Sequence, residues 1–158
     1  MSNFEKNLEQ ALNNAKRLTD KILIDGKLIS AQTNNKIPVL NPSTGENIGS
    51  APQCDKNDVN IAVESAHKAF QKWKKIPARE RGKMVAAGAK RLEERKSEIE
   101  TLLSLDTGNA LRTQAIPETG ASIELTNMFA GLSGELKGEN YPSNIPNSIH
   151  YTTRDPIG

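Results

Sequence analysis

The most reactive nucleophile that this sequence offers is the thiol of Cys54. A cysteine attacks as the thiolate, which forms near neutral pH when a histidine, lysine or arginine beside it stabilises the negative charge. Cys54 lies in the short segment between Pro52 and a predicted helix, and no such group is arranged beside it. We therefore interpret Cys54 as structural or incidental. A single cysteine cannot form an internal disulfide, which favours a reducing compartment.

The two histidines do not form a catalytic or metal-binding motif. His67 lies on the polar side of its predicted helix, together with Asn60, Glu64, Gln71 and Lys74, so we expect a solvated surface position. His150 belongs to a predicted strand near the C-terminus, where a subunit contact and an exposed edge are equally good interpretations. No cluster of cysteines and histidines has the spacing of metal ligands.

A run of basic residues is the next candidate for chemistry, as a surface for nucleic acid. Few aromatic residues interrupt the run, and acidic residues return soon after it, so a solvated helix face is the better interpretation. Lysine and arginine number 21 against 19 aspartates and glutamates, too even a balance to indicate nucleic acid or an anionic membrane as a partner. The basic residues are Lys68, Lys72, Lys74, Lys75, Arg79, Arg81 and Lys83.

Composition indicates one domain with a thin core. The chain has 158 residues, of which 35% are hydrophobic and 4% aromatic. Soluble domains typically contain roughly 45–50% apolar residues, glycine included. The N-terminus lacks an apolar signal core, and no stretch approaches the roughly 20 apolar residues of a membrane span. We expect a soluble, cytoplasmic protein.

Two successive hairpins are the clearest structural prediction. Asp25-Gly26 separates two apolar runs, Lys21-Ile22-Leu23-Ile24 and Lys27-Leu28-Ile29-Ser30, which is a strong hairpin signal. A second pair of strands, residues 36 to 40 and 46 to 51, flanks a turn in which Pro42 fixes φ and Gly45 permits a left-handed residue. The sequence of this turn is Asn41-Pro42-Ser43-Thr44-Gly45-Glu46.

Helices are predicted before and after the hairpins. An amphipathic helix over residues 3 to 19 carries Phe4, Leu8, Ala11, Leu12, Ala15 and Leu18 on one face. A second helix, with Asp55 or Asn57 as N-cap, carries the stripe Val59, Ala62, Val63, Ala66, Phe70 and Trp73, and we expect Trp73 in the core. Pro77 opens a third helix, with Met84, Val85, Gly88, Ala89 and Leu92 facing inward.

Two further helices and a strand complete the predicted elements. Ser97 and Glu100 fit a capping box that opens a helix closing at Gly108. The last helix, residues 117 to 132, has Ala121, Leu125, Met128, Phe129 and Leu132 on one side. Glycines and prolines follow, and then a strand, Ile149-His150-Tyr151-Thr152-Thr153-Arg154, for which no later segment offers a partner. Such a strand usually joins a larger sheet.

In this order the segments resemble the N-terminal third of the NAD(P)-dependent aldehyde dehydrogenases, over residues of about 20 to 158. The resemblance implies an α/β parent with a Rossmann-like cofactor domain. It divides this chain into an N-terminal helical extension (1–20), hairpins and helices of the cofactor domain (21–137) and the start of an oligomerisation arm (138–158). The matching segments are Ile24-Asp25-Gly26, 39–48, Ala69-Phe70-Gln71-Lys72-Trp73, Arg79-Glu80-Arg81, Leu105-Asp106-Thr107-Gly108, Phe129-Ala130-Gly131 and Arg154-Asp155-Pro156-Ile157-Gly158.

The resemblance implies a parent enzyme that oxidises an aldehyde to a carboxylic acid with NAD or NADP, through a cysteine nucleophile and a glutamate base. This chain supplies neither group. A glycine-rich dinucleotide loop is also absent, since Gly131, Gly134 and Gly138 follow a helix and have the wrong spacing. We therefore expect the chain alone to be inactive and assign it no catalytic or cofactor-binding residue.

One binding site is implied by the resemblance, for a structural alkali cation such as Na⁺ or K⁺. Its ligands here would be the Asp106 carboxylate and the backbone carbonyls of Val39 and Leu40, with a further ligand from beyond this chain. Hard cations prefer such oxygen ligands. The alternative interpretation is that Asp106 caps the turn at Thr107-Gly108.

Two other functions remain open at this point. The chain could be a non-catalytic oligomerisation or interaction module that uses the Ile149 to Arg154 strand to form a homo-oligomer. A small nucleic-acid binder built on the basic helices is the third hypothesis, and the charge balance argues against it.

Overall fold

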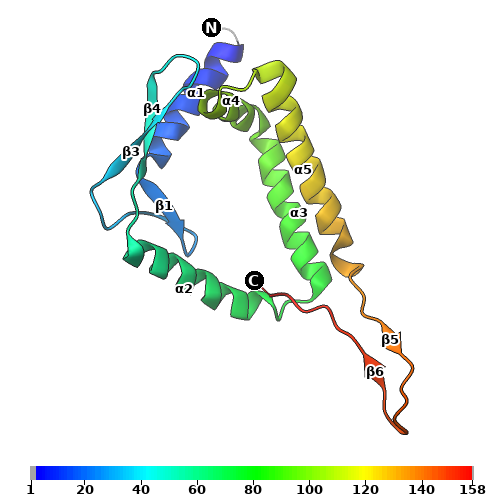
Figure 1. Cartoon of the computed structure of the whole chain (residues 1–158). Coiled ribbons are helices and arrows are strands. Elements are labelled where there is room, and N and C mark those ends of the chain that lie inside the picture. Colours follow the sequence, from blue (N-terminus) through cyan, green and yellow to red (C-terminus); the bar gives the residue numbers. More distant parts are fainter. Residues whose placement is uncertain (1–2, 158) are drawn as a thin grey trace.

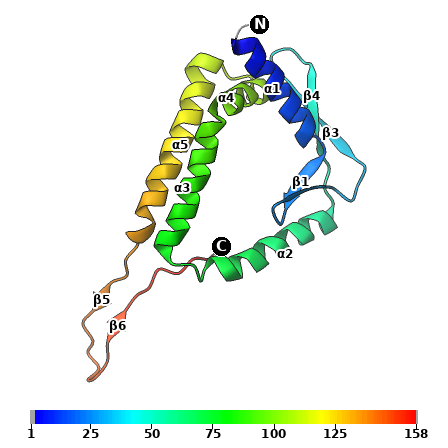
Figure 2. The same cartoon turned by 180° about the vertical axis from the view of Figure 1, so that it is seen from behind.

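The computed structural model describes residues 3–157. Figures 1 and 2 show that the elements follow one another around a ring, from which a two-stranded arm projects. Helix α2 forms one side of the ring and the antiparallel pair α3 and α5 forms another. Helices α1 and α4 and the hairpins close the remaining side. This arrangement leaves few elements with neighbours on both faces.

The N-terminal helix and both hairpins form where the sequence predicts them. Helix α1 spans Asn3–Leu18, and its least exposed described side chains include Leu8, Ala11 and Ala15. The side chain of Phe4, predicted on the same face, lies outside the described part. Strands β1 (Lys21–Ile24) and β2 (Lys27–Ser30) pair antiparallel around Asp25 and Gly26, both at positive φ, as an Asp-Gly hairpin turn requires.

The second hairpin consists of β3 (Lys36–Leu40) and β4 (Asn47–Pro52), with a bulge between Val39 and Leu40. Its turn is stabilised by local bonds: the Ser43 N–H donates to Asn41 Oδ1 over 2.9 Å, and the Glu46 N–H donates to Thr44 Oγ1 over 3.2 Å. Gly45 has φ +74°. The turn therefore has the polar side-chain bonds and the left-handed glycine that its residue types predict.

Helix α2 (Lys56–Trp73) begins at Asp55, not at Asn57. The Asp55 carboxylate accepts from the Asp58 N–H and the Asp58 carboxylate accepts from the Asp55 N–H, which makes a capping box. Asp58 is only 3% exposed and also accepts the Gln32 N–H, at 3.1 Å. This buried carboxylate fastens the start of α2 to the segment between the two hairpins.

Helix α3 begins after Pro77 as predicted, whereas the start of α4 differs from the prediction. Helix α3 spans Ala78–Glu94 after Pro77, α4 spans Lys96–Thr107, and α5 spans Ile116–Gly131. The capping box of Ser97 and Glu100 is wrong, because α4 starts at Lys96 without a side-chain cap. Instead Arg95 binds the buried Glu98. Gly108 ends α4 at φ +74°, as expected. A π-helical segment at Leu111–Ala115 and a 3₁₀ turn at Leu132–Gly134 have no counterpart in the prediction.

Small residues make the closest helix packing. A Cβ on Gly82 of α3 would lie 2.2 Å from Ser133 Oγ and 2.5 Å from the Ala130 carbonyl, so only glycine lets α3 approach the end of α5 this closely. Ala89 and Ala130 are buried in the same region. Among the described residues no large side chain is completely buried, which agrees with a thin core.

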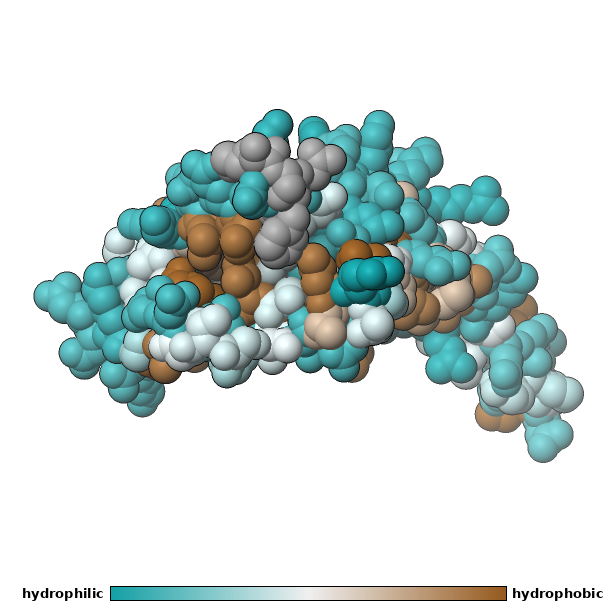
Figure 3. Space-filling model, turned by 90° about the horizontal axis from the view of Figure 1, so that it is seen from above, coloured by the Kyte–Doolittle hydropathy of each residue, from teal (hydrophilic) through white to brown (hydrophobic). Residues whose placement is uncertain are grey.

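Several apolar faces that were expected to be buried are exposed. Val59 and Val63 of α2 are 53% and 62% exposed, and Phe129 of α5 is 62% exposed. Met84 and Leu92 of α3 are also exposed, and Trp73 is only half-buried. The prediction of a buried face was therefore wrong for these residues within this chain. Figure 3 shows apolar side chains reaching the surface among polar ones.

The C-terminal arm is a hairpin. Strand β6 (His150–Tyr151) is shorter than predicted and pairs antiparallel with β5 (Asn140–Tyr141), so the expectation that it has no partner in this chain was wrong. The Thr152 N–H donates to the Glu139 carbonyl at the base of the arm. A Cβ on Gly138 would lie 1.7 Å from the Thr152 carbonyl oxygen, so this close approach requires glycine.

Candidate functional site

Two motifs that are far apart in the sequence meet at the end of α4. A Cβ added to Gly108 would lie 2.8 Å from Pro42 Cγ, so the turn of the β3–β4 hairpin packs directly on the glycine that ends the helix. The Asn109 N–H donates to Thr107 Oγ1 at 3.2 Å. The contact of Pro42 with Gly108 places Asp106, two residues earlier in the last turn of α4, near the hairpin that carries Val39.

A cavity of about 400 Å³ separates α1, the β3–β4 hairpin and α4, and both Val39 and Asp106 border it. Its walls are largely aliphatic, with Thr19, Ser50 and Asp106 as polar groups. Leu40 does not line this cavity. The bulge between Val39 and Leu40 interrupts the strand pairing at the carbonyls that the cation hypothesis invokes. The lining residues are Ala15, Leu18, Thr19, Val39, Ile48, Gly49, Ser50, Ile99, Leu102, Leu103 and Asp106.

The polar side chains that border this cavity, Thr19, Ser50 and Asp106, carry only oxygen atoms, and Asp106 is exposed. Within residues 3–157 there is no group of three or more histidine, cysteine or acidic side chains that could hold a metal. In the same range the Asp106 carboxylate has no hydrogen bond, and the turn after α4 is stabilised by Thr107 and Gly108. One carboxylate with backbone carbonyls is an oxygen set of the kind that alkali and alkaline-earth cations accept.

Two carboxylates that neighbour lining residues in the sequence, Asp20 after Thr19 and Glu98 before Ile99, are stabilised in their charged form. Lys36 and Ser50 donate to Asp20 and lower the pKa of its carboxyl below the usual 3.8. Arg95 donates both a 3.0 Å and a 2.6 Å bond to Glu98, which lowers the pKa of Glu98 below the usual 4.5. Both groups are therefore anchors of structure at neutral pH, not proton donors or acceptors for chemistry.

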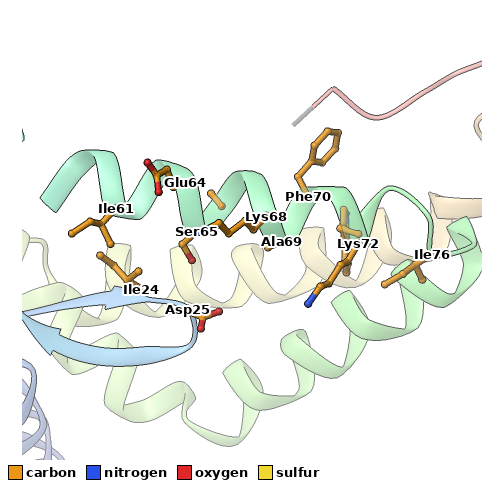
Figure 4. Close-up of a pocket in the computed structure, with 12 residues that line it drawn as sticks. Ile24, Asp25, Ile61, Glu64, Ser65, Lys68, Ala69, Phe70, Lys72 and Ile76 are labelled. Carbon is orange, nitrogen blue, oxygen red and sulfur yellow. The ribbon is translucent and has the colours of Figure 1, made fainter. Parts of the chain in front are cut away.

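A larger, open cavity of about 890 Å³ lies along α2. Figure 4 shows Ile24 and Asp25 of the first hairpin facing Ile61 and Ser65, with Lys72 reaching away from α2 and Phe70 on the opposite side of the helix. The lining is mostly aliphatic and aromatic, and it has no arrangement of nucleophile and base. It is an uncovered packing surface.

The remaining candidates are dispersed. Cys54 and His67 are exposed, and His67 contacts only Gln71, at 3.2 Å, among the hydrogen bonds of the described residues. His150 is exposed on the arm, 3.5 Å from Ser143 Oγ. None of these three residues lines either of the two cavities described above. The expected solvated surface position of His67 agrees with its exposure. The contact of Pro42 with Gly108 was not predicted, because the two residues lie in turns that are far apart in the sequence and meet only in the folded chain.

Comparison with known proteins identifies the architecture. The family model described as "Aldehyde dehydrogenase family" matches residues 28–158. The chain belongs to the aldehyde dehydrogenase family. Among curated aldehyde dehydrogenases, the sequence is 38% identical over 139 residues to aldehyde dehydrogenase tropH of Talaromyces stipitatus, and 33% identical over 141 residues to mitochondrial benzaldehyde dehydrogenase of Antirrhinum majus. These alignments cover 87% and 88% of this chain.

Solved aldehyde dehydrogenases share the fold. Betaine aldehyde dehydrogenase from Staphylococcus aureus, crystallised with NAD⁺, superposes with a TM-score of 0.82 at 28% identity over 90% of this chain. The NAD-dependent benzaldehyde dehydrogenase of Corynebacterium glutamicum superposes with a TM-score of 0.76 at 29% identity over 82% of this chain. The predicted resemblance to an aldehyde dehydrogenase N-terminal portion is thus confirmed.

The match to aldehyde dehydrogenases covers only part of those enzymes. The chain spans 27% and 26% of the two curated relatives, and 29% and 28% of the two solved structures. Helix α1 lies before the residues that the family model matches. Across the described residues, no helix has both the length and the apolarity to cross a bilayer.

Proposed function

We propose that this chain forms the N-terminal portion of an aldehyde dehydrogenase whose parent oxidises an aldehyde to a carboxylic acid with NAD or NADP. The observation that carries the proposal is the family match over residues 28–158 in a chain that spans about a quarter of its relatives. In such an enzyme the cofactor accepts the hydride that the substrate loses. The substrate-activating groups belong to parts of the relatives that this chain does not span.

The role of residues 3–157 in that enzyme is a frame for the cofactor domain. Their strand pairs are all antiparallel, and the described residues contain no parallel strand followed by a glycine-rich turn, so no dinucleotide site is assigned to them. The exposed faces of α2 and α5, which include Val63 and Phe129, are apolar surfaces of the kind that the interior of a larger domain would cover.

The arm serves oligomerisation in this proposal. It projects from the ring (Figure 1), and its apolar side chains Ile149 and Tyr151 are 79% and 69% exposed. A two-stranded ribbon with unpaired edges and apolar side chains is suited to adding strands to the sheet of a second copy. The parent is therefore proposed to be a homo-oligomer held in part through residues 149 to 154.

An alkali cation, Na⁺ or K⁺, is proposed to bind next to Asp106. The carbonyls of Val39 and Leu40 would supply further oxygen ligands, and support comes from the shared cavity of Val39 and Asp106 and from the bulge at Val39 and Leu40. Its role would be structural, because neutralising Asp106 stabilises the contact between the β3–β4 turn and α4. Thermal unfolding in KCl against choline chloride tests this: a higher midpoint in KCl that is absent in Asp106→Asn is expected, and equal midpoints contradict it.

The main proposal is tested by two measurements on the chain as it stands. Incubated with NAD or NADP and a panel of aliphatic and aromatic aldehydes, the chain is expected to form no NADH or NADPH, and Cys54→Ser should behave identically. Turnover that Cys54→Ser abolishes would show instead that Cys54 is a nucleophile. Sequencing the transcript beyond the codon for Gly158 tests the parent: an open frame encoding a later cysteine supports it.

The second candidate function is a non-catalytic oligomerisation module, and the exposed arm favours it. Light scattering and thermal unfolding separate the two proposals. A defined dimer that unfolds cooperatively indicates a module, whereas concentration-dependent aggregation indicates a portion of a larger enzyme whose apolar faces lack their cover.

A further inference from the structure

Helix α1 lies between the β3–β4 hairpin and α4, and its C-terminal end is bonded to the hairpin. Asp20, which follows the helix at φ +60°, donates its N–H to the Ser50 carbonyl at 3.0 Å. Ser50 Oγ returns a 2.6 Å bond to Asp20 Oδ1, and the Lys36 ammonium pairs with the other carboxylate oxygen. One residue thus holds both strands, because Lys36 belongs to β3 and Ser50 to β4.

The same end of α1 lies over the strand residue that faces Val39. A Cβ on Gly49 would lie 3.1 Å from Thr19 Oγ1, so glycine at this position permits the approach of α1 to β4. Gly49 is the direct antiparallel partner of Val39. The position of the Val39 backbone is therefore coupled to α1 through a single strand pair.

The other side of α1 is anchored to α4. Ala11 is completely buried, and Glu98 of α4 is 7% exposed. Asn14 and Arg17 of α1 also lower the pKa of Glu98, after the larger effect of Arg95, which indicates that both side chains lie near this carboxylate. Asp106 lies eight residues further along α4, about 12 Å at 1.5 Å per residue of helix.

We infer that α1 is a positioning element that fixes the separation of the β3–β4 hairpin from α4, and so sets the distance between Val39 and Asp106 across their shared cavity. The contact of Pro42 with Gly108 also joins the hairpin to the end of α4, while Ala15 and Leu18 of α1 line the cavity itself. The consequence for cation binding rests on the proposed function of Asp106, whereas the positioning role stands on the contacts of α1 alone.

Distance measurement between nitroxide labels tests this inference. The labels are placed at the exposed positions Ile37 of β3 and Ser97 of α4, in a Cys54→Ser background, and the distance distribution is recorded by pulsed electron resonance. Asp20→Ala is expected to roughly double the width of the distribution, because the hairpin loses its bonds to α1 and samples more positions. Asp20→Asn, which keeps an acceptor for Ser50, should restore most of the narrow distribution.

The matched control is Asp25→Ala. Asp25 also has positive φ, +52°, so its replacement imposes similar backbone strain, but it lies in the first hairpin and away from α1. The inference is overturned if the distance distribution of Asp20→Ala is as narrow as that of the unsubstituted chain. Equal broadening of the distribution by Asp25→Ala also overturns it. Addition of K⁺ should narrow the distribution further, and Asp106→Asn should abolish that response. If K⁺ does not change the distance distribution of the unsubstituted chain, the cation site is refuted and the positioning role is unaffected.

Discussion

At the scale of single residues, the hydroxyl of Thr119 has an unfavourable position. Thr119 is 4% exposed on α5, and its Oγ1 is the buried side-chain polar atom that lacks a hydrogen bond among the described residues. A buried polar atom without a partner retains its full desolvation cost. Thr119→Val should therefore raise the free energy of unfolding by about 1 kcal/mol in urea denaturation.

The matched control is Thr101→Val, since Thr101 is 5% exposed and donates to the Ser97 carbonyl at 2.9 Å. Its replacement removes a satisfied hydrogen bond and should lower the free energy of unfolding by about 1 kcal/mol. Opposite signs for the two variants are the expected result. A loss of stability in both would mean that Thr119 has a partner, such as a bound water.

Glu98 should make the stability of the folded chain depend on pH. Its folded pKa is lowered, first by the hydrogen bonds from Arg95, so the ionised carboxylate stabilises the native state above the unfolded pKa of about 4.5. As the pH falls below 4.5 and through the lowered folded pKa, that contribution disappears. The Glu98→Gln variant should thus be less stable than the unsubstituted chain at pH 7. The difference in unfolding free energy between the two should shrink toward pH 3 in denaturant titrations. A pH-independent difference would contradict this linkage.

At the scale of elements, the contact between the hairpin turn and the end of α4 can be isolated with two glycines. Gly108 and Gly45 both have φ +74°, but a Cβ meets Pro42 only at Gly108, and nothing lies within 4 Å at Gly45. Gly45→Ala should cost about 1 kcal/mol of unfolding free energy, from the left-handed backbone alone. Gly108→Ala should cost about 2–4 kcal/mol because the clash adds to that strain. Equal losses would show that the contact contributes nothing.

How well each element could be predicted from the sequence depends on whether local or long-range interactions specify it. The Asp25-Gly26 hairpin and the Gly108 helix end were predictable because turn chemistry is local. The π-helical segment at Leu111–Ala115 was not, because no residue type marks it. Ser97 failed as an N-cap because α4 begins two residues earlier than such a cap requires, at Lys96, where Arg95 pairs with Glu98. Long-range contacts such as Pro42 with Gly108 leave no pattern in one sequence.

The candidate site could be predicted only through family resemblance. Asp106 and Val39 are separated by more than sixty residues, as their numbers show, and neither has a chemically distinctive neighbour in the sequence. The structure adds that both border one cavity and that α1 bonds to the hairpin and to α4 beside it. Leu40, which the resemblance paired with Val39, lies outside that lining.

At the scale of the whole molecule, the dominant property is apolar surface without cover. Periodicity correctly identified the stripes on α2 and α5, yet periodicity cannot say whether the partner surface is in the same chain. Val63 and Phe129, both 62% exposed, belong to those stripes. Large exposed patches of this kind promote self-association. The isolated chain should therefore associate as its concentration rises, and light scattering should report a growing mean mass.

Charge on these faces should reverse the association. The double variant Val63→Lys and Phe129→Lys removes two apolar side chains that are each 62% exposed, so the free energy of unfolding should change by less than about 0.5 kcal/mol. The control double variant Asn60→Lys and Asn127→Lys adds the same charge to exposed polar positions of the same helices. Only the first should lower the scattering mass at equal concentration. Equal effects of both variants would attribute the change to net charge, and the apolar faces would then not be the contact surfaces.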